Sequence, residues 1–139
     1  MTARPHLEAV PDTGTEVMLV LPIEADWLAL ARTTGGAVAA RADFTYDEIA
    51  DLRLAIDELC LSLIERNSST GRIKLRYTLR EGTLRVEANI IEGKTEPLGR
   101  SERVGQEFSE RILDALVDAH GRSDDEQPGA WFAKQRAAH

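Results

Sequence analysis

Two neighbouring segments of the chain alternate apolar and polar residues with a period of two. Their apolar positions are Ile73, Leu75, Tyr77 and Leu79 in the first segment, and Leu84, Val86, Ala88 and Ile90 in the second. Such alternation is typical of β-strands with one buried face. Because Glu81-Gly82 separates the two segments, the pattern predicts a β-hairpin.

A helical period of three and four residues precedes the hairpin. It consists of Ile49, Leu52, Ile56, Leu59 and Leu63, which form one apolar stripe. The four residues from Thr45 to Glu48 have the form of a capping box, in which these two side chains satisfy backbone amides of the first turn. We therefore predict a long helix that starts at this box and ends near Asn67.

The segments before the long helix predict one strand and one helix. Residues 16–23 are short and mostly apolar, with Pro22 near the end, which favours a strand. Residues 26–40 predict a helix that Gly35 and Gly36 weaken. Its expected apolar stripe consists of Trp27, Leu30, Thr34 and Val38.

The segments after the hairpin predict a loop, a helix and a closing strand. Residues 92–105 contain scattered glycines, a proline and charges, which is typical of an irregular loop. A helix ending near His120-Gly121 follows, with the apolar residues Phe108, Ile112, Leu113, Leu116 and Val117. An acidic turn at 124–127 leads to a short apolar strand at 130–133.

The order of these elements predicts an α+β fold, a two-layer sandwich with helices on one face of a mostly antiparallel sheet. Residues 1–14 lack apolar periodicity and are expected to form a flexible tail. The remainder, residues 15–139, is long enough to bury one core, so we expect a single domain.

Charge and composition narrow the function classes. The net charge is -7, and we see no basic patch for phosphate contacts, which argues against direct nucleic-acid binding and favours a basic protein partner. No apolar segment is long enough to span a membrane, and the N-terminal residues do not resemble a signal peptide. The lone Cys60 is compatible with a reducing compartment, so we expect a cytoplasmic protein.

The ten residues from Asp51 to Cys60 read DLRLAIDELC, and this string is specific. It closely resembles the long helix of the RsbW-like anti-sigma factor serine kinases, a branch of the GHKL (Bergerat) ATPases. The resemblance extends over residues 16–134 and includes the hairpin, the loop and the helix containing Ala115-Leu116-Val117-Asp118. It implies the Bergerat version of the two-layer sandwich.

The resemblance implies an ATP site, of which Glu58 and Ser62 would form part. In the family a glutamate acts as general base, and an asparagine four residues later holds magnesium. Here Glu58 occupies the first position and Ser62 the second, one helical turn apart and on the same face. Serine lacks the amide carbonyl that the asparagine supplies. The alternative is that Glu58 belongs to a solvated polar face.

Other nucleotide positions of the family are altered in this chain. Gly93 matches the first glycine of the Asp-x-Gly-x-Gly turn, which places Ile91 where the adenine-binding aspartate should be. Glu107 and Ser109 replace glycines that cradle phosphates, and Gly105 is the nearest that remains. A carboxylate at a triphosphate position repels the ligand. We expect that no cofactor is required and that ATP with magnesium binds weakly.

Several other residue types were considered as sites. Cys60 lies next to the apolar stripe and is expected to be a small buried hydrophobe rather than a nucleophile. The three histidines are far apart in sequence, and none has metal-ligand spacing, so Ser62 is the one candidate magnesium position. Trp27, Trp131 and Phe132 are expected to be core anchors.

Acidic residues are dense between positions 43 and 65, where Arg53 is the single base. They form either a solvated face or a docking surface for a basic partner. We select Asp47 and Asp51 there, and Asp124 and Asp125 in the acidic turn, as candidate partner-binding residues.

The resemblance implies an anti-sigma factor that sequesters a sigma-F-like RNA polymerase sigma factor, of the stress-response or sporulation type, and is released by an anti-anti-sigma (STAS) protein. It also implies a homodimer. The alternative is an active serine-protein kinase that phosphorylates its anti-anti-sigma factor. A third, more distant reading is a free-standing dimerising domain of a sensor histidine kinase.

Overall fold

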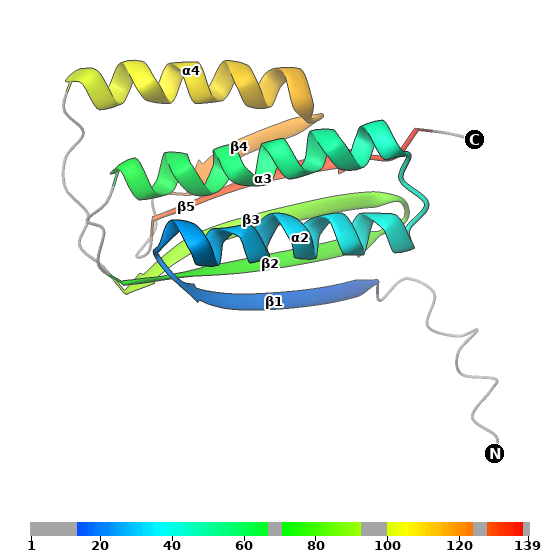
Figure 1. Cartoon of the computed structure of the whole chain (residues 1–139). Coiled ribbons are helices and arrows are strands. Elements are labelled where there is room, and N and C mark those ends of the chain that lie inside the picture. Colours follow the sequence, from blue (N-terminus) through cyan, green and yellow to red (C-terminus); the bar gives the residue numbers. More distant parts are fainter. Residues whose placement is uncertain (1–13, 67–70, 93–99, 124–127, 138–139) are drawn as a thin grey trace.

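The computed structural model describes residues 14–66, 71–92, 100–123 and 128–137. It has two layers, with three helices on one face of a five-stranded antiparallel sheet of order β1-β2-β3-β5-β4 (Figure 1). The predicted α+β class is confirmed. In chain order, the elements are β1 (Thr15–Pro22), α2 (Ala25–Arg41), α3 (Tyr46–Arg66), β2 (Arg72–Arg80), β3 (Thr83–Glu92), α4 (Arg100–Leu116), β4 (Ala119–Ser123) and β5 (Gly129–Gln135).

The hairpin and the strands beside it form as predicted. β2 pairs with β3 in the expected antiparallel register, and Glu81 and Gly82 at the turn both have positive φ, at 50° and 77°. A two-residue turn with positive φ at both positions matches the right-handed twist of the strands. The apolar residues of both strands face the helices and are buried, and β1 pairs with the free side of β2.

The predicted long helix, α3, is the central helix of the fold. Its capping box is present: the Thr45 amide donates to Glu48 Oε1 at 2.7 Å, and the Glu48 amide donates to Thr45 Oγ1 at 3.1 Å. Four of the five stripe residues are fully buried, and the fifth, Ile49, packs against the core. Cys60 is also buried, and burial raises the pKa of its thiol to about 12, so it behaves as a small hydrophobe.

The helix α2 buries a face of small residues instead of the predicted stripe. Trp27 and Leu30 are exposed, at 47% and 42%, and Val38 is the one stripe residue in the core. The buried face consists of Ala31, Gly35, Gly36, Val38 and Ala39. This face lets α2 approach α3 and the sheet so closely that a Cβ on Gly35 would overlap Ile56. The predicted stripe was wrong because it assumed that the largest apolar side chains are buried. In this helix the small residues are buried, since they allow its backbone to lie close to α3 and the sheet.

Two further apolar predictions were wrong. Of the three expected core anchors, Phe132 is fully buried, whereas Trp27 is half exposed and Trp131 lies on the sheet face opposite the helices. Phe108, expected in the apolar stripe of its helix, is 66% exposed. The register of α4 turns Ser109 inward instead, while Leu113 of the predicted stripe is buried as expected.

The region after the hairpin differs from its prediction at two places. The expected loop at 92–105 is helical from Arg100, since its Glu, Arg and Gln residues are good helix formers and outweigh Gly105. The helix ends at Leu116, and His120-Gly121 belongs to β4, which the sequence analysis missed. This strand is short and polar, and it exists because it pairs with β5 at the sheet edge.

The sheet also brings together basic residues that the sequence analysis did not place on one face. Alternation along β2 and β3 places Lys74, Arg76, Arg80 and Arg85 on the sheet face opposite the helices. We call these four residues the basic row. None of the helices in the described ranges is long and apolar enough to cross a membrane.

Candidate functional site

The candidate general base, Glu58, lies where α3 and α4 pack against each other. Ser109 of α4 donates a hydrogen bond to Glu58 Oε2 at 2.8 Å. Ser109 is 8% exposed, so this contact is shielded from water. The helices run antiparallel, because Gly105 approaches Glu65 near one end and Ser109 approaches Glu58 further along. Ser109, aligned to a phosphate glycine by the resemblance, is thus a direct partner of Glu58.

A cavity of about 250 Å³ lies between α3, α4 and the β4–β5 edge. Leu59, Leu113 and Ala130 form its apolar part. Ser62 lines it but donates its hydroxyl to the Leu59 carbonyl at 2.9 Å, inside its own helix. His120 also lines it, and its Nε2 lies 2.6 Å from Asp114 Oδ1.

The remaining nucleotide positions do not gather around this cavity. In the β2–β3 ladder, Arg72 faces Glu92 and Ile73 faces Ile90, so Ile91 is an extra residue on β3; it is absent from the described cavity lining. Glu107 is exposed on α4. Gly93 lies outside the described residues.

Gly105 is inside α4 rather than in a loop that opens it. It is the sixth residue of the helix, so its amide lies beyond the four unpaired donors of a helix N-terminus. A Cβ at this position would find open space, with Glu65 Oε2 at 4.0 Å as the nearest atom. Neither the backbone conformation nor the packing requires glycine here.

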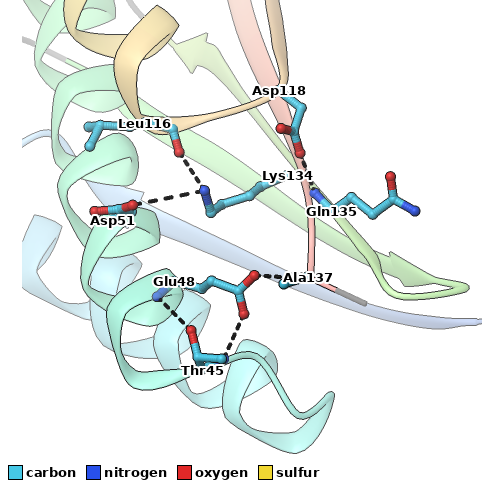
Figure 2. Close-up of polar contacts among 8 residues, drawn as sticks. All are labelled: Thr45, Glu48, Asp51, Leu116, Asp118, Lys134, Gln135 and Ala137. Atoms are coloured by element: carbon cyan, nitrogen blue, oxygen red, sulfur yellow. Dashed lines mark hydrogen bonds and ion pairs between the residues drawn. The ribbon is translucent and has the colours of Figure 1, made fainter. Parts of the chain in front are cut away.

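The predicted partner-binding residues differ in their surroundings. Asp47 is exposed in the first turn of α3, whereas Asp51 is half-buried and faces Lys134 of β5 at 3.9 Å (Figure 2). The ammonium of Lys134 also donates to the Leu116 carbonyl at 2.8 Å, and its side chain is 13% exposed. Asp124 and Asp125 lie outside the described residues.

Most of the other acidic residues of this stretch have internal partners. Glu48 accepts the Ala137 amide in addition to its capping bond, as Figure 2 shows, and Asp57 pairs with Arg32 of α2 at 3.2 Å. Asp43 lies 3.8 Å from Arg136. The acidic run therefore serves α3 and its neighbours, and Asp47 has no ion-pair partner within the described ranges.

A surface groove between α2 and α3 was missed by the sequence analysis. It has a volume of about 410 Å³, and its lining includes the Arg32–Asp57 pair and the exposed Tyr46 and Leu54. Tyr46 is 86% exposed, and Ile49, the partly buried member of the apolar stripe, lines the same groove. The sequence contained one signal for this groove: Leu54 is an apolar residue of α3 that lies outside the apolar stripe.

Metal ligands are not gathered at the candidate site. Within the described ranges, no group of three or more His, Cys, Asp or Glu side chains is placed to hold a metal ion.

Comparison with known proteins gives a consistent set of relatives. The chain is 31% identical over 75 residues to the serine-protein kinase RsbW of Bacillus cereus, and this match covers 52% of the chain and 47% of the relative. The corresponding proteins of Bacillus anthracis and Bacillus velezensis are 30% and 29% identical over 73 residues, covering 51% and 50% of the chain and 46% of each relative. No protein-family model matches.

The matched region spans slightly less than half of the length of these curated relatives. The relatives agree with one another, and the helix-on-sheet architecture agrees with the fold that the resemblance implies. The chain is RsbW-like in sequence and has the α+β fold class that this resemblance implies.

Proposed function

We propose that the chain is an anti-sigma factor that acts in the cytoplasm. It sequesters a sigma-F-like sigma factor, is released by an anti-anti-sigma (STAS) partner, and works as a homodimer. The Ser109–Glu58 hydrogen bond carries the proposal, because it engages the candidate general base with a side chain of α4. This contact favours stoichiometric binding over phosphoryl transfer.

Three features of the candidate site support the loss of a working nucleotide site. The cavity of about 250 Å³ is smaller than the roughly 300–1,000 Å³ that is usual for ligand pockets. One oxygen of Glu58 already accepts a hydrogen bond, and the Ser62 hydroxyl is directed at its own helix. These residues fit magnesium and a triphosphate poorly, and ATP binding is expected to be weak.

A second function, serine-protein kinase, is favoured by a different observation. The relatives in Bacillus are named serine-protein kinases, and Glu58 remains at the general-base position. Under this alternative, Ser109 would have to give up its hydrogen bond to Glu58 Oε2 before that oxygen could act as the base.

The sigma factor is proposed to dock at the start of α3. Asp47 supplies an exposed carboxylate, and Tyr46 and Leu54 supply exposed apolar surface beside it. Carboxylates can cover the basic surface that a sigma factor presents to DNA, and they raise the association rate. Asp51 contributes less, since Lys134 already faces it.

Co-purification from cells with this chain as bait tests the binding function directly. Recovery of a sigma factor supports the proposal, and its absence from repeated preparations under conditions in which the STAS partner is absent contradicts it. Calorimetry with ATP and magnesium tests the nucleotide site independently. A magnesium-dependent affinity in the low micromolar range would contradict its proposed loss.

Radiolabel transfer to a STAS protein separates the binder from the kinase. We expect no transfer by the wild-type chain, and Glu58→Ala should leave sigma-factor binding nearly unchanged. A working general base contributes about 10²–10⁴-fold to a rate, so a kinase would lose transfer by that factor in Glu58→Ala. Glu24→Ala is the matched control, since Glu24 is an exposed glutamate at the start of α2 that makes no side-chain capping bond. Transfer that Glu58→Ala alone abolishes would establish the kinase.

Charge reversal tests the electrostatic part of the docking. Asp47→Lys should slow association with the sigma factor without unfolding the domain, and raising salt from about 50 to about 300 mM should do the same, since screening shortens the Debye length. The double change Asp124→Lys and Asp125→Lys tests the acidic turn separately. An association rate that responds to none of these changes would place the interface on apolar groups alone.

A further inference from the structure

The sheet face opposite the helices is charged and mixed in character. Cross-strand neighbours on this face run from Met18 through Arg76, Glu87 and Trp131 to Gly121, one from each of the five strands. Every second residue of β2 lies on this face, and all of these residues except Thr78 are basic. A protein of net charge -7 therefore carries a basic surface on one side of its sheet.

A hollow of about 500 Å³ lies on this face, and three arginines of the basic row line it. These are Arg76, Arg80 and Arg85, and the three glutamates Glu16, Glu81 and Glu87 line the same hollow. Arg85 is bonded to Glu87 at 3.0 Å. Arg76 is less satisfied: its Nε is buried, has no hydrogen-bond partner among the described residues, and lies 3.9 Å from Glu16 Oε2.

A guanidinium N–H that is buried and unpaired is unfavourable, and the Arg76 side chain, which is 40% exposed, can shift to bring this N–H to an incoming anion. The long Glu16 contact does not replace a hydrogen bond at that distance. Arg76 therefore lines the hollow, together with Arg80 and Arg85, while its Nε–H is unsatisfied.

Apolar residues lie on both sides of the basic row. Met18 and Val20 of β1 are half exposed and lie directly beside Arg76 and Lys74. On the other side, the Trp131 ring packs against Gly121, where a Cβ would lie about 3 Å from the indole, and the Arg85 guanidinium stacks 4.2 Å from the ring centroid. The face thus presents cations between two apolar borders.

We propose that this face binds an acidic amphipathic segment of a protein partner, with carboxylates on the basic row and apolar side chains against Met18, Val20 and Trp131. The proposal is independent of the sigma-factor proposal, since it concerns the side of the sheet opposite the helices. A nucleic acid fits less well, because Glu16 and Glu87 interrupt the basic surface and the net charge repels a polyanion. A second copy would bring another basic row rather than a continuous acidic surface.

A synthetic peptide provides the probe: a fluorescein-labelled 16-residue amphipathic peptide with glutamates on one face and leucines on the other. Anisotropy measures its binding to the full chain. Arg76→Glu with Arg80→Glu should weaken binding at least about tenfold, because both cationic contacts become repulsive. The matched control, Arg41→Glu with Arg111→Glu, makes the same change in net charge at exposed positions on α2 and α4 and should change affinity less than about twofold.

Amide chemical shifts of the wild-type chain provide a second readout that needs no variant. The peptide should shift amides of β2 and β3 more than those of α3, and the milder Arg76→Gln with Arg80→Gln should reduce these shifts if the reversed variant does not fold. The proposal is overturned by peptide that does not bind, by equal losses in the control, or by shifts confined to the helices. It is also overturned if a 16-nucleotide poly-dT strand binds more tightly at the same face, or if Arg76→Glu with Arg80→Glu converts a sedimenting dimer into a monomer, which would place a second copy on this face.

Discussion

The helix α3 has one neighbour on each side, and the two contacts are built differently. Towards α2, small residues bring the backbones close together, and the Tyr77 hydroxyl donates to the Ala31 carbonyl at 2.7 Å to join this helix to the sheet. Towards α4, the contact contains the Ser109–Glu58 hydrogen bond and the cavity of about 250 Å³. The closely packed contact with α2 has room for a ligand only in its surface groove. The contact with α4 already contains a cavity and a polar side-chain pair, which a ligand could occupy or replace. The α2 side is structural, and the α4 side carries the candidate chemistry.

The largest effect is expected from a change on the close-packed side. Gly35→Val should destabilise the domain by about 3 kcal/mol, since its Cβ would overlap Ile56 and press on the Tyr77 ring in a filled core. Urea denaturation measures this effect. Ala37→Val, at an exposed position of the same helix, is the matched control and should cost only about 0.5 kcal/mol from helix propensity. Equal losses in the two variants would mean that α2 and α3 are not in close contact.

A smaller effect is expected from the polar side. Ser109→Ala should destabilise by about 1 kcal/mol, because Glu58 loses a shielded hydrogen bond while the rest of the contact remains. Ser62→Ala is the control, since the Ser62 hydroxyl bonds within its own helix. If Ser109→Ala cost no more than Ser62→Ala, the Ser109–Glu58 contact would not hold α4 in place.

The third change should have the opposite sign. Gly105→Ala is expected to stabilise the domain by about 0.5–1 kcal/mol, because alanine is the better helix former and the added Cβ has space beside Glu65. The same method of urea denaturation applies. Destabilisation would show that α4 packs more tightly than the described contact, or that glycine is required at this position for another reason.

The parts of the fold that the sequence predicted are those with a local cause. The hairpin follows from alternation around Glu81-Gly82, and α3 follows from its capping box and apolar stripe. β4 has no such local cause, since its pairing with β5 creates the strand. The buried face of α2 also depends on a distant contact, that of Gly35 with Ile56.

The candidate site shows the same division. Glu58 and Ser62 could be placed on one face of a helix from their spacing alone. The partner of Glu58 could not be predicted, because Ser109 lies 51 residues away and reaches it only through the packing of α4. Likewise, the sequence marked Asp51 as acidic and did not reveal that Lys134, on the closing strand, faces it.

The last prediction concerns the capping box at the start of α3, the helix that both contacts have in common. Backbone hydrogen bonding from Thr45, with a further bond from Ala137, holds the pKa of Glu48 below its ordinary value of 4.5. A carboxylate with a lowered folded-state pKa stabilises the fold above its unfolded pKa, and this contribution is lost as pH falls through the lowered value. The domain should therefore lose stability below about pH 4.5, and Glu48→Gln should lose less between pH 7 and pH 3 than the wild type. Glu107→Gln, exposed on α4, should follow the wild-type curve. If Glu48→Gln also followed that curve, the capping carboxylate would not contribute to acid sensitivity, and the cause would have to lie in the ion pairs along the rest of the helix, such as Asp57 with Arg32.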